Sequence, residues 1–322
     1  MSRVLFWGPL LQLRQFESSI HCSAEGSRWP EIRLSGFVPQ VPVRAEIVLL
    51  HDLGACAASL TALATGLSDH GFRVLVPDLP GHGATAARLP RGRRDFSEIV
   101  EALFEQAPDA EVSADAAGDP VVLPRFLGGL GWGASAALNV AAGSLGDVLA
   151  GIVLIEPLLA QIPATLQPTV RAGVGYAQRL EAAEALLQGW RLDWLLGGLR
   201  VRVPVTQSAQ LPGAAALPYR LYRPFSSGAE GLQRTFWCEN PVLAMLPNLS
   251  HCIDVGRAAT QIESFGTGFE VRQFEHADLS LVHQIAEWLD GLIDNPGRET
   301  PQPMYPPGLP SHPSHRKPTW IG

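Results

Sequence analysis

Residues 131–136 read Gly-Trp-Gly-Ala-Ser-Ala, and their setting in the chain decides the fold. A strand-like run, 121–130, precedes them, and a helix-like run, 136–142, follows them. A sharp turn between a strand and a helix is the setting of a nucleophile elbow, G-x-S-x-G, which holds a serine oxygen up for attack. The frame is present here, but the favoured alignment puts Gly133 where the serine would stand.

Several segments around this turn extend the pattern. They are Glu-Ile-Val-Leu-Leu (46–50) before His-Asp-Leu-Gly (51–54), Arg-Val-Leu-Val-Pro (73–77) before Asp-Leu-Pro-Gly-His-Gly (78–83), a strand-like run at 151–157, and Glu-Val-Arg-Gln-Phe-Glu-His-Ala-Asp-Leu (270–279). In order and spacing, these segments resemble the α/β-hydrolase superfamily over residues 18–294. The segment 51–54 resembles the H-G-x-G oxyanion loop of that family, and 78–83 resembles its D-x-x-G-x-G turn.

The resemblance implies an α/β-hydrolase fold, with a mostly parallel central sheet flanked by helices and a helical cap insertion. The expected parts are an N-terminal extension (1–14), the first part of the core (15–156), the cap (157–240), the second part of the core (241–294) and a Pro-rich tail (295–322). Strands at 15–21 and 31–37 are expected to form the antiparallel start of the sheet. Helices are expected at 60–70, 95–106 and 281–293.

Composition excludes several classes of protein. The net charge is −7 and no long Lys/Arg run is present, so nucleic-acid binding is disfavoured. No apolar run reaches the ~18 residues of a membrane span. The four cysteines are scattered without CxxC spacing, which predicts free thiols and neither a metal site nor a disulfide framework. No cofactor is expected.

A serine hydrolase needs a nucleophile, a histidine base and an acid that orients the base. In the favoured frame Gly133 removes the nucleophile; in the rival frame, Gly133 to Ala137, Ser135 would supply it. The resemblance assigns the base to His276, just after the last predicted strand. The acid is harder to find, because the family's usual position is occupied here by Ser250 or His251 and Asp254 comes late. Glu156 matches an alternative acid position.

The oxyanion loop can survive the loss of a nucleophile, because its donors are backbone N–H groups. His51, Asp52, Leu53 and Gly54, with Trp132 and the N–H of Ala134, are therefore the expected oxyanion-loop and ligand-binding residues.

Two functions follow from these features. The first is a degenerate α/β-hydrolase that serves as a binding or assembly subunit, with the Pro-rich tail and N-terminal extension as partner surfaces and a small acyl or ester-like ligand under the cap. The second is an enzyme, either an esterase using Ser135 with His276 or a non-hydrolytic catalyst. The absence of a secretion signal predicts an intracellular protein, cytoplasmic or organellar. The N-terminal extension is a candidate targeting segment, with mitochondria as one destination.

Overall fold

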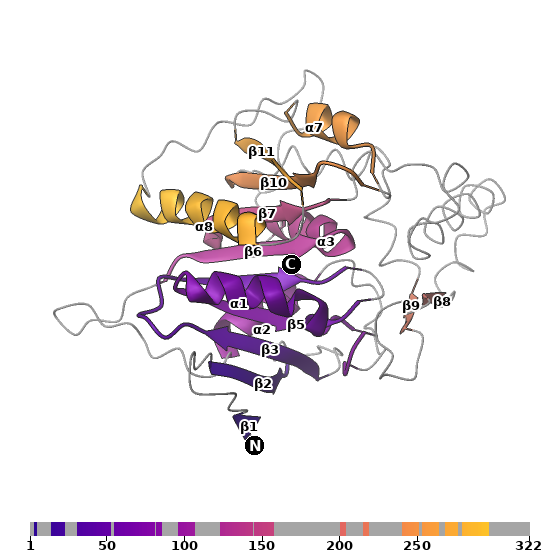
Figure 1. Ribbon diagram of the computed structural model, residues 1–322. Helices are drawn as coiled ribbons and strands as arrows, with labels where there is room; N and C mark the ends of the chain where they lie inside the picture. Colours follow the sequence, from indigo (N-terminus) through magenta and orange to yellow (C-terminus); the bar gives the residue numbers. More distant parts are fainter. Residues whose placement is uncertain are drawn as a thin grey trace, which may run out of the picture.

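The computed structural model describes residues 3–4, 14–22, 31–52, 55–80, 82–85, 96–106, 123–143, 145–157, 200–203, 215–218, 240–250, 253–263, 268–275 and 279–295. Within them, nine strands form one sheet in the order β1-β2-β3-β5-β4-β6-β7-β10-β11 (Figure 1). Their bounds are β1 Arg3–Val4, β2 Arg14–Ile20, β3 Ile32–Val38, β4 Ala45–Leu50, β5 Phe72–Pro77, β6 Arg125–Leu130, β7 Gly151–Ile155, β10 Val242–Pro247 and β11 Phe269–Phe274.

The sheet is antiparallel at one edge and parallel through the rest. β1, β2 and β3 pair antiparallel, β3 also pairs antiparallel with β5, and every pair from β5 to β11 is parallel. The expected antiparallel start of a mostly parallel sheet is therefore confirmed. Because parallel strands end at the same edge, the loops that follow β4, β6, β7 and β10 meet at one end of the sheet.

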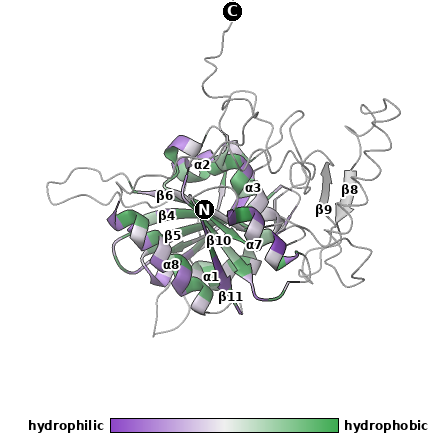
Figure 2. Ribbon diagram, turned by 90° about the horizontal axis from the view of Figure 1, so that it is seen from above, coloured by the Kyte–Doolittle hydropathy of each residue, from purple (hydrophilic) through white to green (hydrophobic). Residues whose placement is uncertain are grey.

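Helices cover both faces of the sheet (Figure 2). One face carries α1 (Thr61–Asp69) and α8 (Leu279–Asp294); the other carries α2 (Ser97–Gln106), α3 (Trp132–Ala141) and α7 (Val255–Glu263). Two short 3-10 helices, η1 (Ala57–Leu60) and η2 (Gly146–Val148), lie in connections. None of the helices in the described ranges is long and apolar enough to cross a membrane.

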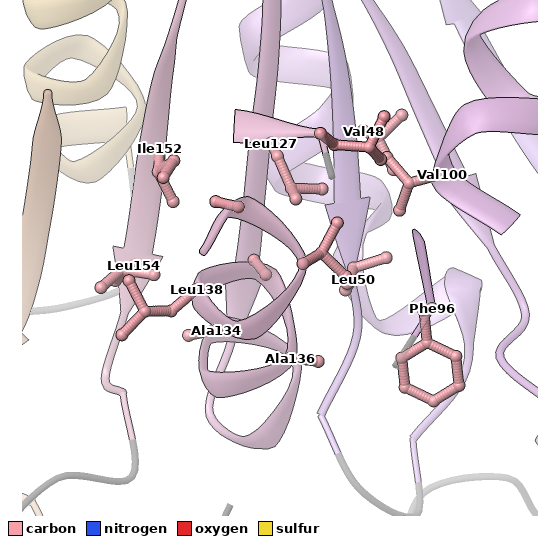
Figure 3. Packing of buried hydrophobic residues seen from close by; sticks show 14 of the residues in the cluster. Val48, Leu50, Phe96, Val100, Leu127, Ala134, Ala136, Leu138, Ile152 and Leu154 are labelled. Carbon is pink, nitrogen blue, oxygen red and sulfur yellow. The ribbon is translucent and has the colours of Figure 1, made fainter. Parts of the chain in front are cut away.

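The central strands are buried on both faces, as expected for parallel strands between helix layers. All six residues of each of β4, β5 and β10 are buried. Small residues let α3 pack close to this sheet: Ala134 and Ala136 are buried, and Leu138 lies in one cluster with Leu154 of β7 (Figure 3).

The ends of the chain and the expected cap fall largely outside the described residues. Within 157–240, the described part includes Pro157, the antiparallel pair β8 (Arg200–Val203) and β9 (Ala215–Pro218), and Asn240. From the N-terminal extension, Arg3 and Val4 pair with Glu17 and Phe16 of β2. The tail beyond residue 295 is outside the described part, so the cap and tail stay predictions.

Candidate active site

The turn between β6 and α3 has its tip at Gly131. This residue has φ 59° and ψ −116°, a backbone conformation that residues other than glycine rarely adopt. Its N–H donates to the Ile155 carbonyl at 2.9 Å, which ties the turn to the end of β7. The alignment that puts Gly133 where the serine would stand was wrong, because Gly133 already lies in the first turn of α3 and the positive φ is at Gly131.

Glycines on both sides of Gly131 explain the local geometry. A Cβ on Gly129 would lie within 3.0 Å of the Gly133 and Ala134 backbone, and a Cβ on Gly133 would lie within 3.0 Å of the Leu50 and His51 carbonyl oxygens. Only glycine allows these close approaches. The elbow therefore runs from Gly129 to Gly133, and Gly131 stands where G-x-S-x-G has its serine.

The corrected alignment also changes the place of Ser135, Trp132 and Ala134 in the motif. Ser135 lies within α3, four residues after the tip and half-buried, and its N–H is bonded to the Gly131 carbonyl at 3.3 Å. The residue that follows the tip is Trp132, so its N–H takes the place expected for the N–H of Ala134 in the oxyanion hole. Three glycines at alternate positions, 129, 131 and 133, are the sequence signal that identifies this frame.

The side chain of Asp52 reaches the tip of the turn. Asp52 follows β4, and its Oδ1 accepts a hydrogen bond from the Trp132 backbone N–H at 2.8 Å. Its carboxylate is also so close to Gly131 that a Cβ there would lie 2.6 Å from Asp52 Cγ. Asp52 is only 8% exposed. A carboxylate thus contacts the helix N-terminus where the family binds an oxyanion.

His51 fixes the backbone next to Asp52. The Leu79 N–H donates to His51 Nε2 at 3.0 Å, so the ring proton is on Nδ1, which donates to the Asp52 carbonyl at 2.8 Å. The ring is fully buried, and this desolvation lowers the pKa of His51 from 6.5 to about 4. His51 is therefore a neutral structural imidazole at pH 7.

A second buried imidazole lies behind the turn. The ring centroids of His82 and His51 are 5.0 Å apart. The His82 ring also stacks on the Trp132 ring, with 6.1 Å between their centroids. Desolvation is the main reason that the pKa of His82 falls to about 3, and the neighbouring His51 lowers it further. Asp78 holds the same region together, since its carboxylate accepts the N–H groups of Ala57 and Ala84, each at 2.7 Å.

Glu156, the candidate acid, follows β7 directly. It has φ 48° and is the one non-glycine residue with positive φ among the described residues. Its Oε1 accepts a hydrogen bond from Ser250 Oγ at 2.5 Å, and Ser250 also accepts the Ile253 N–H at 3.1 Å. Glu156 is thus joined to the loop after β10, where the family's usual acid would stand.

Three of the expected site residues, Leu53, Gly54 and His276, lie outside the described ranges, as does His251. The described part therefore brings together Asp52, Gly131 and Trp132, and separately Glu156 and Ser250. It contains no cluster of three or more His, Cys, Asp or Glu side chains suited to a metal ion.

Comparison with curated proteins gives one relative at low identity. The chain is 28% identical over 198 residues to the magnesium-chelatase 30 kDa subunit of Rhodobacter capsulatus, covering 49% of this chain and 67% of that protein.

Solved structures share the fold at lower identity. A soluble variant of monoglyceride lipase from Saccharomyces cerevisiae has a TM-score of 0.58 and 17% identity, covering 85% of this chain and 96% of that one. A carboxyl esterase from Bacillus coagulans has a TM-score of 0.55 and 16% identity, covering 87% and 99%. A haloalkane dehalogenase from Bradyrhizobium elkanii has a TM-score of 0.55 and 13% identity, covering 88% and 98%. At these identities, the likeness shows the fold alone.

A family model matches the part of the chain that contains β4, β5, β6 and β7. The model described as serine aminopeptidase, S33, matches residues 41–201, which is half of the 322 residues. The chain therefore belongs to this family of α/β-hydrolases.

Proposed function

We propose that this chain is a non-hydrolytic α/β-hydrolase that serves as a binding or assembly subunit. The observation that carries the proposal is Gly131 at the tip of the turn. A serine hydrolase attacks its substrate with an oxygen held at this tip, and glycine has no side chain to supply one. Ser135 lies one helical turn away, inside α3.

The assembly role draws support from the similarity to a protein named as a magnesium-chelatase subunit. By this proposal the chain works inside the cell within a larger complex, and the N-terminal extension and the Pro-rich tail contact its partners. Any small ligand under the cap is held without covalent chemistry. The working parts of the site are then the loop at 51–54 and the start of α3.

The first test concerns hydrolysis. Purified protein is treated with a fluorophosphonate probe and with a p-nitrophenyl ester, alongside Ser135→Ala as the matched variant. We expect no labelling and no difference in turnover between the two proteins. Labelling and turnover that both disappear in Ser135→Ala would contradict the proposal and identify an esterase that uses Ser135, with His276 as its base and Glu156 as its acid.

The second test concerns assembly. The chain is tagged in its own host and its native mass is compared with the 34.6 kDa of the monomer. We expect a defined larger complex that persists through two purification steps and is lost when residues 296–322 are removed. A monomer at every stage would contradict the assembly role.

A further inference from the structure

Asp52 is the second residue of the segment that resembles the family's H-G-x-G loop, so it stands where that pattern has glycine. Its Oδ1 is 2.8 Å from the Trp132 backbone nitrogen, at the start of the ten-residue helix α3. The first N–H groups of a helix lack partners within the helix, and the helix dipole favours negative charge there. The chain thus supplies its own anion to a position that suits an anion.

Asp52 and a side chain at position 131 cannot both keep these positions, so a side chain at 131 would force the Asp52 carboxylate to shift. A Cβ on Gly131 would lie 2.6 Å from Asp52 Cγ and 2.9 Å from Oδ2, and closer still to Oδ1. Real Cβ atoms essentially never approach a heavy atom to less than 3.0 Å. The carboxylate therefore fills the space in which a nucleophilic side chain would begin.

Asp52 also occupies a donor that hydrolysis requires. An oxyanion hole works when its N–H groups lie about 2.7–3.1 Å from the developing oxyanion. The Trp132 N–H already makes a bond of that length to Asp52, and the carboxylate would repel a second negative oxygen. A carboxylate can itself act as a nucleophile, but this one uses the donor that its own tetrahedral intermediate would need.

We propose that Asp52 is a built-in anion that closes the oxyanion hole from within, and that Asp52 and Gly131 form a mutually dependent pair. The inference rests on the proposed loss of hydrolysis and deepens it. The chain then has two separate blocks to acyl transfer: no nucleophile at position 131, and no free N–H at Trp132 to receive an oxyanion. Returning a serine to position 131 removes only the first block.

The pair is tested by a double-mutant cycle on unfolding in urea. We expect Gly131→Ala to raise the unfolding equilibrium constant at least tenfold more in wild type than in Asp52→Ala, a coupling of about 1.4 kcal/mol. The matched control is Gly71→Ala, because Gly71 has φ 89° and its nearest atom to an added Cβ is Arg44 Cδ at 3.2 Å. Its effect should be equal in both backgrounds. A coupling of less than twofold between Gly131→Ala and Asp52→Ala would overturn the proposal that Asp52 and Gly131 depend on each other.

A second measurement does not depend on Gly131 variants folding. With ¹⁵N-tryptophan labelling, the Trp132 amide is assigned through Trp132→Phe and compared between wild type and Asp52→Ala. We expect this amide to shift upfield and exchange faster in Asp52→Ala, by more than any other tryptophan amide. An unchanged chemical shift and exchange rate of the Trp132 amide would overturn the proposal that Asp52 closes the oxyanion hole.

Neither readout measures activity. Wild-type ester hydrolysis would contradict the proposed function, and an absent coupling or an unchanged amide would contradict the role of Asp52.

Discussion

Arg73 Nη1 donates a hydrogen bond to Glu46 Oε1 at 2.7 Å, and the two side chains are only 1% and 7% exposed. They face each other across the parallel register of β4 and β5. On the other side of β4, Arg125 Nε of β6 lies 3.7 Å from Glu46 Oε2. One carboxylate is thus held between two guanidinium groups, at the end of the sheet opposite the turn at Gly131.

Removing this carboxylate should destabilise the protein strongly. Glu46→Ala breaks the buried pair with Arg73, and removing one partner of a buried ion pair typically lowers the free energy of unfolding by about 3–5 kcal/mol. Glu46→Leu combined with Arg73→Met should be less harmful than Glu46→Ala, because it removes both charges. Urea unfolding measures the free energy of unfolding of the single and the double variant, with Glu287→Ala as the control. That exposed partner of Arg272 should change stability by less than about 1 kcal/mol.

Regaining hydrolysis should require two changes at the turn. Gly131→Ser alone should give no fluorophosphonate labelling, because the Asp52 carboxylate overlaps the new side chain and holds the Trp132 N–H. Asp52→Ala with Gly131→Ser should be labelled if His276 occupies the base position expected for it. A serine held in this sparsely populated backbone conformation adds a strain of roughly 1–3 kcal/mol, so stability is measured first.

Position 133 provides the control for this rescue. The fluorophosphonate should not label Gly133→Ser in the wild-type or the Asp52→Ala background. The Cβ of a serine there would collide with the Leu50 and His51 carbonyl oxygens and destabilise the fold. Labelling of the Gly131→Ser single variant would show that Asp52 does not obstruct the site.

The sequence was sufficient for the fold because the decisive strands are wholly buried. β10 is a continuous apolar run, β4 and β5 are apolar apart from Glu46 and Arg73, and the loops after β4 and β5 carry recognisable motifs. The sequence predicts strands at 241–246 and 269–274, and both agree with the structure to within one residue at each end. Helices such as α1 and α8 follow from their apolar spacing.

The site was harder, because its geometry depends on contacts between distant residues. Residue types favoured Gly133 over Ser135 as the tip, with no third frame considered, whereas the backbone puts the positive φ at Gly131. The Asp52–Trp132 hydrogen bond spans 80 residues, and no local pattern encodes it. Glu156 was identified by its place after a strand, but its positive φ and its bond to Ser250 could not be read from residue type.

The hydrogen bond between Ser250 and Glu156 should offset the strain at Glu156. Glu156→Gly removes the positive-φ strain, roughly 1–2 kcal/mol, but it also loses a bond to a carboxylate, typically ~1.5–3 kcal/mol. We expect net destabilisation in wild type and a smaller loss, or a gain, in a Ser250→Ala background. A urea double-mutant cycle measures the difference. Equal effects in the two backgrounds would show that the bond does not hold Glu156 in place.

Acid should destabilise the fold through the buried imidazoles before most carboxylates titrate. The pKa of His51 falls to about 4 and that of His82 to about 3 in the folded chain, whereas an unfolded histidine titrates near 6.5. Between these values the unfolded chain binds more protons than the folded chain, so stability falls as pH falls. Each histidine can lower the free energy of unfolding by up to about 1.4 kcal/mol as the pH falls from 6 to 5.

Replacing one of the two rings should roughly halve that slope. His82→Phe keeps an aromatic ring against Trp132 and removes one titrating group, so its free energy of unfolding should depend less steeply on pH between 7 and 5. His51 is less suitable for replacement, because it bonds both Leu79 and Asp52. Urea unfolding at half-unit pH steps gives the slopes, and an unchanged slope in His82→Phe would show that this ring is not held neutral by the fold.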